Sequence, residues 1–163
     1  MTTPASSHAI TESRQRVPAI VHVLNPLIQR LLRAGMPMGP NVVLTVRGRT
    51  SGRAIDVPVA LLEAGGRRFV QSPFGEVQWT RNLRATPEAI LKRGRDEEAV
   101  TARALPPEEA AAVLRYALAP FLRMRAGRWF LGHYYAVRLD SSDADYLHEA
   151  SEHPVFELRP VQA

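Results

Sequence analysis

Three arginines and two glycines lie close together between two apolar runs of the sequence. They form the segment Arg47-Gly48-Arg49-Thr50-Ser51-Gly52-Arg53. Arginine binds phosphate and carboxylate groups through paired N–H bonds, and glycine lets backbone N–H groups turn toward a ligand and approach it closely. The segment is therefore a candidate anion-binding turn, although a solvated hairpin tip has the same composition.

A second candidate for ligand binding is the loop Ser72-Pro73-Phe74-Gly75-Glu76. It precedes a helical pattern, so its free N–H groups would lie at a helix N-terminus, where partial positive charge collects. Such groups can bind a phosphate or the carbonyl of a ring, while capping by Ser72 or Glu76 explains the same residues. On that helix Trp79 and Asn82 share a face, where they can line a ring pocket or serve separately as core and surface.

No protein nucleophile or metal site is recognisable in the sequence. There is no cysteine, which excludes disulfides, thiolate metal sites and a cysteine nucleophile. The five histidines show no metal-ligand spacing, so no metal is expected; they are His8, His22, His133, His148 and His153. Neither a Ser-His-Asp set nor a P-loop or GxGxxG sequence is present. Redox or group-transfer chemistry would therefore depend on a bound organic cofactor.

The net charge of +5 comes almost wholly from arginine, because Lys92 is the only lysine among 21 basic residues. This bias suits an anionic partner, and a G+C-rich coding sequence produces it equally well. The arginines are scattered and the aromatic content of 7% is not concentrated on a stacking strand, so no nucleic-acid partner is expected. Without a long apolar run or a signal pattern, a cytoplasmic protein is predicted, with membrane association as an alternative.

The pattern of apolar residues predicts a flexible N-terminal arm over 1–16 and a single domain over 17–163. The domain begins with an amphipathic helix that starts near Pro18 and stops before Gly35. Its basic and apolar faces suit either a lid on the core or a peripheral contact with a membrane surface.

The rest of the chain alternates between strand and helix patterns. Strands are predicted over 41–47, 55–62, 67–71, 89–91, 98–104 and 154–159, and Tyr134–Leu139 also alternates like a strand. Helices are predicted over 76–85, 106–118, 121–130 and 143–150. About six mostly antiparallel strands in a chain of this length favour a barrel, because closure removes exposed edges. The expected fold is α+β, a split β-barrel with flanking helices.

Taken as a set, several of these segments resemble the deazaflavin-dependent nitroreductase family, split-barrel oxidoreductases related to flavin-binding proteins. They are Leu44–Gly52, Val57–Val59, Ser72–Gly75 and Trp79–Leu83, and Pro154–Leu158 is similar to the family's last strand. The resemblance implies an enzyme that binds coenzyme F420, a deazaflavin with a phosphate and an oligoglutamate tail. It further implies hydride transfer from the reduced cofactor to an electron-poor small molecule, such as a quinone, a nitro compound or an activated alkene.

The resemblance also assigns roles to residues. The turn Arg49–Gly52 would hold the phosphate, the backbone of Val57–Val59 and Gln71–Gly75 would line the deazaflavin ring, and Trp79 with Asn82 would pack beside it. The full set expected to bind the cofactor is Arg47, Arg49, Thr50, Ser51, Gly52, Arg53, Val57, Pro58, Val59, Gln71, Ser72, Pro73, Phe74, Gly75, Trp79 and Asn82. Tyr134 and Tyr135 are the catalytic candidates on the substrate side, and a homodimer is expected because split barrels commonly pair.

The sequence departs from the family pattern at two positions. The family commonly has a lysine just before the Ser-Gly pair and an arginine a few residues later, where this chain has Thr50 and Ile55. If the anion site is kept, Arg47, Arg49 or Arg53 must compensate. Two other functions therefore remain open: an FMN-binding split-barrel oxidoreductase, and a non-catalytic module that binds a cofactor or a membrane surface.

Overall fold

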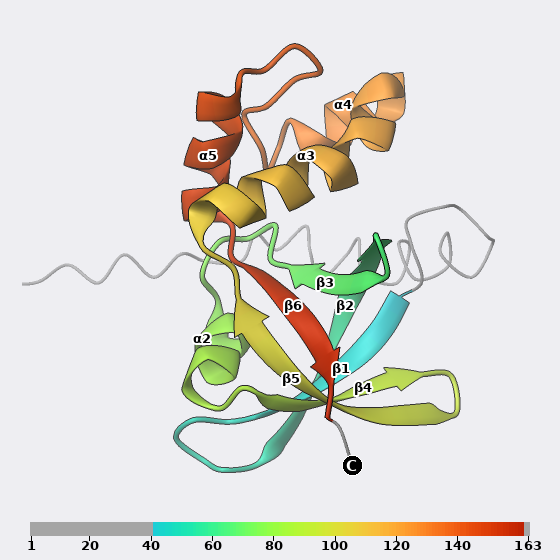
Figure 1. Cartoon of the computed structure of the whole chain (residues 1–163), viewed down its shortest axis with the longest axis vertical. Helices are drawn as coiled ribbons and strands as arrows, with labels where there is room; N and C mark the ends of the chain where they lie inside the picture. The colour runs from blue at the N-terminus through green and yellow to red at the C-terminus, as the bar shows by residue number, and fades with distance from the viewer. Residues whose placement is uncertain (1–40, 162–163) are drawn as a thin grey trace, which may run out of the picture.

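The computed structural model describes residues 41–161, so the predicted N-terminal arm and first helix lie outside the described residues. The described elements follow the order β1 (Asn41–Arg47), β2 (Ala54–Ala64), β3 (Arg67–Gln71), α2 (Gln78–Ala85), β4 (Glu88–Arg93), β5 (Asp96–Ala104), α3 (Pro107–Arg123), α4 (Arg125–Leu131), α5 (Asp143–Glu152) and β6 (Val155–Pro160). Figure 1 shows α3, α4 and α5 gathered on one side of the sheet, with α2 packed against another part of it. None of the helices at positions 41–161 is long and apolar enough to cross a bilayer.

The six strands form a closed barrel in the order β1-β2-β3-β6-β5-β4, which confirms the predicted fold class. Every pairing is antiparallel, and the barrel closes where Val43 of β1 pairs with Lys92 of β4. The last strand, β6, inserts between β3 and β5 and thus joins the first hairpin to the second. Residues that are far apart in the sequence therefore meet along β6.

Two apolar clusters hold the domain together. One fills the barrel, where alternate residues of each strand point inward, as Val42, Leu44 and Val46 do on β1. The other lies between the barrel and the helices, and includes Leu114 and Leu118 of α3. On β6, Val155 belongs to the outer cluster and Phe156 to the inner one, so this strand is buried on both faces.

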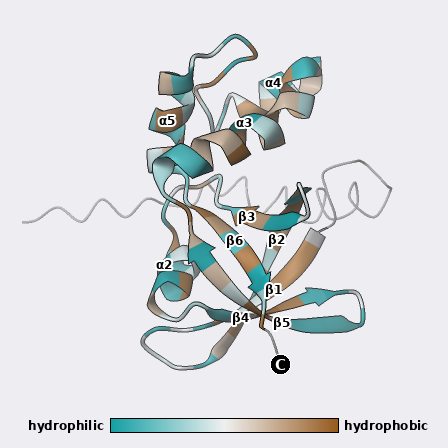
Figure 2. Cartoon of the chain, in the orientation of Figure 1, coloured by the Kyte–Doolittle hydropathy of each residue, from teal (hydrophilic) through white to brown (hydrophobic). Residues whose placement is uncertain are grey.

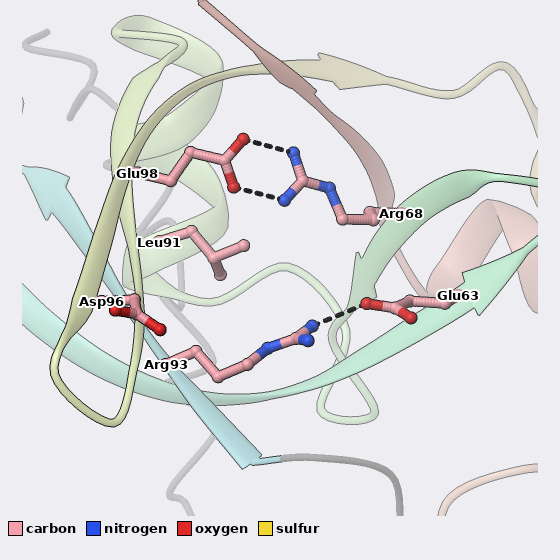
Figure 3. Close-up of a pocket in the computed structure, with 6 residues that line it drawn as sticks. All are labelled: Glu63, Arg68, Leu91, Arg93, Asp96 and Glu98. Atoms are coloured by element: carbon pink, nitrogen blue, oxygen red, sulfur yellow. Dashed lines mark hydrogen bonds and ion pairs between the residues drawn. The ribbon is translucent and has the colours of Figure 1, made fainter.

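Charged side chains rather than apolar ones close one end of the barrel interior. Arg68 donates two hydrogen bonds to Glu98 at 2.5 and 3.0 Å, and Arg93 donates one to Glu63 at 2.6 Å (Figure 3). These pairs line a cavity of about 190 Å³, and the β4–β5 hairpin beside it is hydrophilic in Figure 2. The hydrogen bond from Arg68 lowers the pKa of Glu98. Both arginines that line this cavity are already bound to carboxylates, so the ion pairs link strands across the barrel. Neither arginine is left unpaired to bind an anionic ligand.

The structure confirms most of the predicted elements and corrects one of them. The helix predicted from 106 runs on to Arg123, and Met124 separates it from α4. Tyr134–Leu139 is not a strand. Its alternation is real, because Tyr135 and Val137 are buried and Ala136 and Arg138 are exposed. The buried pair packs against the helical cluster, however, and the closed barrel leaves this segment no strand to pair with.

Candidate functional site

The arginine turn connects β1 to β2 and is closed by its own backbone. The Gly48 N–H donates to the Arg53 carbonyl at 2.8 Å, and the Gly52 N–H donates to the Gly48 carbonyl at 2.7 Å. Gly52 has a φ of 65°, a conformation that favours glycine. Gly48 is closely surrounded, because an added Cβ would lie 2.6 Å from the Ser51 hydroxyl and 3.4 Å from the Arg53 carbonyl. The two glycines therefore fix the turn and leave Arg49, Thr50 and Arg53 exposed.

Arg49 attaches this turn to helix α2. The Asn82 side-chain oxygen accepts hydrogen bonds from the Arg49 backbone N–H at 3.2 Å and from its guanidinium at 3.0 Å. The same guanidinium donates to the Gln78 side-chain oxygen at 2.8 Å. Asn82 is buried, and its carbonyl oxygen is thus used to position Arg49 rather than offered to a ligand. Gln78 is a further member of the site that the sequence did not single out.

Helix α2 starts at Gln78, two residues later than predicted, and neither Ser72 nor Glu76 caps it. Instead the Thr80 hydroxyl accepts from the Val77 N–H at 3.0 Å and donates to the Val77 carbonyl at 2.8 Å. Glu76 forms a salt bridge with Arg84 at 3.0 Å. Since neither alternative cap is used, the Ser72 side chain is left for another purpose.

The Ser72 loop is anchored to the end of helix α5. The Ser72 N–H donates to the Pro154 carbonyl at 3.1 Å, and the Ser72 carbonyl lies 3.2 Å from the His153 Nδ1. Gly75, with a φ of 69°, passes so close to the Glu152 carbonyl that an added Cβ would lie 3.2 Å from that oxygen. Among residues 41–161 the Ser72 hydroxyl is the only buried side-chain oxygen or nitrogen without a hydrogen-bond partner. A ligand that supplied a partner here would remove the cost of this unsatisfied group.

His153 and Glu149 form a buried pair behind this loop. His153 Nε2 lies 3.1 Å from a Glu149 carboxylate oxygen, whose other oxygen accepts from the Ala136 N–H at 2.9 Å. The two contacts hold the His153 ring between helix α5 and the Ser72 loop. The sequence signal for this pair was the spacing of an acid and a histidine by four residues on one helix face.

The two tyrosines predicted for the substrate side have different environments. Tyr134 is half-buried and makes an edge-to-face contact with Phe74 of the loop, with ring centroids 5.3 Å apart. Tyr135 is buried, its hydroxyl donates to the Gln71 side chain, and its ring packs on His153 at 4.5 Å. Burial raises the pKa of Tyr135. Tyr134 can therefore meet a ligand at the loop, whereas Tyr135 supports the loop from behind.

The remaining predicted residues lie between the turn and the loop. Val57, Pro58 and Val59 are on β2, which leads out of the arginine turn, and only Val59 of these is buried. Trp79 is partly buried and packs against the barrel core, with its ring centroid 5.9 Å from that of Phe156. Because Arg49 contacts the first residue of α2 and the Ser72 loop leads into α2, the turn and the loop meet at the start of this helix.

The electrostatic character of the site comes from arginines whose charge is not neutralised. Within residues 41–161, no carboxylate lies at salt-bridge distance from Arg47, Arg49 or Arg53. The side-chain partners of Arg49, Gln78 and Asn82, are neutral amides. A turn with excess positive charge, next to a loop with a buried free hydroxyl, can hold an elongated ligand with an anionic end and a polar ring.

The chain was compared with curated proteins and with solved structures. No curated protein is significantly similar to the chain. A solved structure described as an F420-H2 dependent reductase (FDR-A) is 24% identical, covers 74% of this chain and 94% of its own, and has a TM-score of 0.44. A protein of unknown function from Agrobacterium tumefaciens is 13% identical over 75% of this chain and 48% of its own, with a TM-score of 0.51. The latter shows a shared fold alone.

The family itself is shown by a match that covers more than half of the sequence. Residues 29–120 match the model of the F420H(2)-dependent quinone reductase family. The match spans the arginine turn, the Ser72 loop and α2, which together make up the candidate site. The chain therefore belongs to the F420H(2)-dependent quinone reductase family and is an F420-dependent oxidoreductase whose cofactor is coenzyme F420.

Proposed function

We propose that this enzyme reduces a small electron-poor acceptor with hydride from reduced F420, and that the acceptor is a quinone rather than a nitro compound or an activated alkene. The family description supports the quinone class. Bound F420 supplies the hydride, so the chain itself has to bind, orient and shield the reactants. This fits a site that has no obvious nucleophile or general base.

The observation that carries the proposal is the set of arginines on the β1–β2 turn. A phosphate and an oligoglutamate tail are polyanionic, and Arg47, Arg49 and Arg53 have no carboxylate partner among the described residues. Arg49 is moreover held in place by α2 before any ligand binds, which lowers the entropic cost of binding. These residues fit the cofactor although Thr50 and Ile55 depart from the family pattern.

The ring of the cofactor is assigned to the other end of the site. The backbone of Val57–Val59 and Gln71–Gly75 would line it, and the Ser72 hydroxyl would gain a partner there. Trp79 would contribute only the part of its indole that is not packed in the core, and Asn82 would act by holding Arg49. Tyr134, next to Phe74, would form the acceptor side of the pocket.

A titration of the protein with F420 tests the cofactor assignment. We expect F420 to bind more tightly than FMN, and its affinity to fall with added salt because the tail is charged. Arg49→Ala should weaken F420 binding roughly ten- to hundred-fold, the effect of losing one charge-assisted contact. Arg95→Ala is the matched control, since Arg95 is exposed on the β4–β5 turn and the substitution removes the same charge. Equal affinity of Arg49→Ala and wild type, or tighter FMN binding, would contradict the proposal.

Oxidation of reduced F420 in the presence of a soluble quinone tests the reaction. We expect turnover with the quinone and slower turnover with a nitroaromatic compound of similar size. F420 binding without turnover of any acceptor would indicate a cofactor-binding protein instead. The homodimer stays a prediction, and sedimentation velocity of the full chain would test it.

A further inference from the structure

The corner between α3 and α4 exposes large apolar side chains that the proposed function does not use. Trp129 is 73% exposed and Met124 is 51% exposed, although both residue types are usually packed. Met124 is the extended residue at which α3 ends and α4 begins, and Trp129 follows on α4. Figure 2 shows that α4 carries both hydrophobic and hydrophilic residues. We call the surface formed by Met124, Trp129, Arg123, Arg125, Arg128 and Arg138 the α3–α4 corner.

The corner is also strongly basic. Residues 110–139 contain five arginines and no aspartate or glutamate: Arg115, Arg123, Arg125, Arg128 and Arg138. Of these, Arg115 binds Asp143 at 2.5 Å. The other four are exposed and have no carboxylate at salt-bridge distance within residues 41–161.

This charge is concentrated rather than spread over the surface. Among the described residues, the arginines without a carboxylate partner are the three of the arginine turn, the four of the α3–α4 corner, and Arg81 and Arg95. The arginines on β3, β5 and β6 are all bound to glutamates. The corner is thus a second place where the protein has positive charge available for an anionic partner.

Aromatic contacts connect the corner to the Ser72 loop. Trp129 meets His133 with ring centroids 4.9 Å apart, and Phe130, next to Trp129 on α4, meets Tyr134 at 5.4 Å. Tyr134 in turn meets Phe74 of the loop. A cavity of about 600 Å³ also opens at the corner, lined by Leu122, Arg128, Tyr135 and Val137 among others. An apolar molecule at the corner would therefore be close to a path of aromatic and aliphatic groups that leads toward the cofactor loop.

We propose that the α3–α4 corner docks on the surface of a membrane that contains anionic lipids. Tryptophan is favoured at the boundary between headgroups and acyl chains, and arginine binds lipid phosphates. Each arginine brought close to an anionic surface strengthens binding roughly five-fold. Docking in this orientation would place the acceptor side of the site next to the membrane, so a lipid-soluble quinone could reach it. This last step rests on the proposed function, whereas the docking itself does not.

Sedimentation of the full chain with lipid vesicles tests the docking. We expect binding to phosphatidylcholine vesicles that contain about 30% phosphatidylglycerol, weak binding to phosphatidylcholine alone, and a loss of binding as salt rises from about 0.1 M to about 0.5 M. Arg123→Gln with Arg125→Gln should weaken binding roughly 25-fold, and Trp129→Ser should weaken it at least several-fold. All three side chains are exposed, so these variants should fold.

The matched control is Arg81→Gln with Arg95→Gln, which makes the same change in net charge at exposed arginines elsewhere. Vesicle binding that does not depend on anionic lipid, or that all of these variants retain equally, would overturn the proposal; in the second case another part of the chain binds lipid. If Trp129→Ser instead converts a dimer to a monomer in sedimentation velocity, the corner is an interface between two copies, which would overturn it as well.

A second assay separates the docking from the proposed function. Oxidation of reduced F420 is measured with a quinone embedded in the anionic vesicles and with a soluble quinone. The corner variants should slow the first reaction and leave the second unchanged. If neither quinone is reduced, the proposed function fails while the vesicle binding still decides the docking.

Discussion

Thr50 and Ile55 lie in and directly after the arginine turn, where a basic side chain would strengthen the proposed binding of a polyanionic tail. Both are exposed, and both stand where the resembling family commonly has a basic residue. We predict that Thr50→Lys tightens F420 binding roughly ten-fold, because it adds a charge-assisted contact beside Arg49. A titration at two salt concentrations checks this, since the gain should shrink as salt rises. Thr50→Gln is the uncharged control of similar length, and an equal gain from it would show that charge is not the cause.

One ring nitrogen of His153 contacts the Ser72 carbonyl, and the other contacts the buried Glu149 carboxyl group. We predict that His153→Phe lowers the free energy of unfolding by about 3 kcal/mol, because a ring remains against Tyr135 while the buried Glu149 side chain loses its partner. Urea denaturation measures this. Adding Glu149→Gln to His153→Phe should recover part of the loss, since it removes the unpaired charge. If Glu149→Gln restores none of the lost stability, the pair carries no charge. A separate measurement, ¹⁵N NMR of His153 in the wild type, shows whether both ring nitrogens are protonated.

At the level of elements, the sequence predicted best those strands whose partners follow directly in the chain. β1, β2 and β3 follow one another with only short glycine-containing turns between them, so their pairing is a local property. The strands β4 and β5 were predicted too short, because the charged residues 92–97 were interpreted as a turn, whereas β4 continues to Arg93 and β5 begins at Asp96. The strand predicted over Tyr134–Leu139 was wrong for the opposite reason: its residues alternate between buried and exposed, but no strand is free to pair with it.

The junction of α3 and α4 depends on Gly127. An added Cβ at this position would overlap the backbone carbonyl of Phe121, which cannot move without opening the junction. We predict that Gly127→Ala destabilises the protein by about 2–3 kcal/mol, although alanine is normally the better helix former. Ala126→Gly is the control, because Ala126 is exposed and the change should cost only about 1 kcal/mol through helix propensity. Denaturation curves in which Gly127→Ala is the more stable variant would contradict this packing argument.

For the whole molecule, the sequence predicted the turn and the loop of the candidate site, but not which of their residues are held in place by contacts from elsewhere. The turn and the loop could be found because each is a local pattern of glycine, arginine and serine. Asn82 holds Arg49, which lies 33 residues away, and Tyr135 holds Gln71, which lies 64 residues away. Such contacts are set by barrel closure and leave no local pattern. The same closure brings the C-terminal strand into the middle of the sheet, where Glu157 links three strands.

Glu157 is buried on β6 and binds Arg67 of β3 at 2.6 Å, Arg103 of β5 at 3.1 Å and Arg159 of its own strand at 2.8 Å. These bonds lower the pKa of Glu157 from 4.5 to about 2, with the bond from Arg67 as the largest cause. A pKa that is lower in the folded state means that the carboxylate stabilises the fold above about pH 4.5 and that this stabilisation is lost as the pH falls toward 2. Allowing for solvent around its partly exposed partners, the contribution is about 2 kcal/mol.

We therefore predict that Glu157→Gln is less stable than wild type near pH 6 by about this amount, and that the difference shrinks steadily as the pH is lowered to about 3. Urea denaturation of both proteins across this range measures it. Glu63→Gln serves as the control, because its partner Arg93 joins it at an exposed position where an ion pair contributes little. A difference between Glu157→Gln and wild type that does not change with pH would mean that shape and neutral hydrogen bonds, rather than charge, hold β6 between β3 and β5.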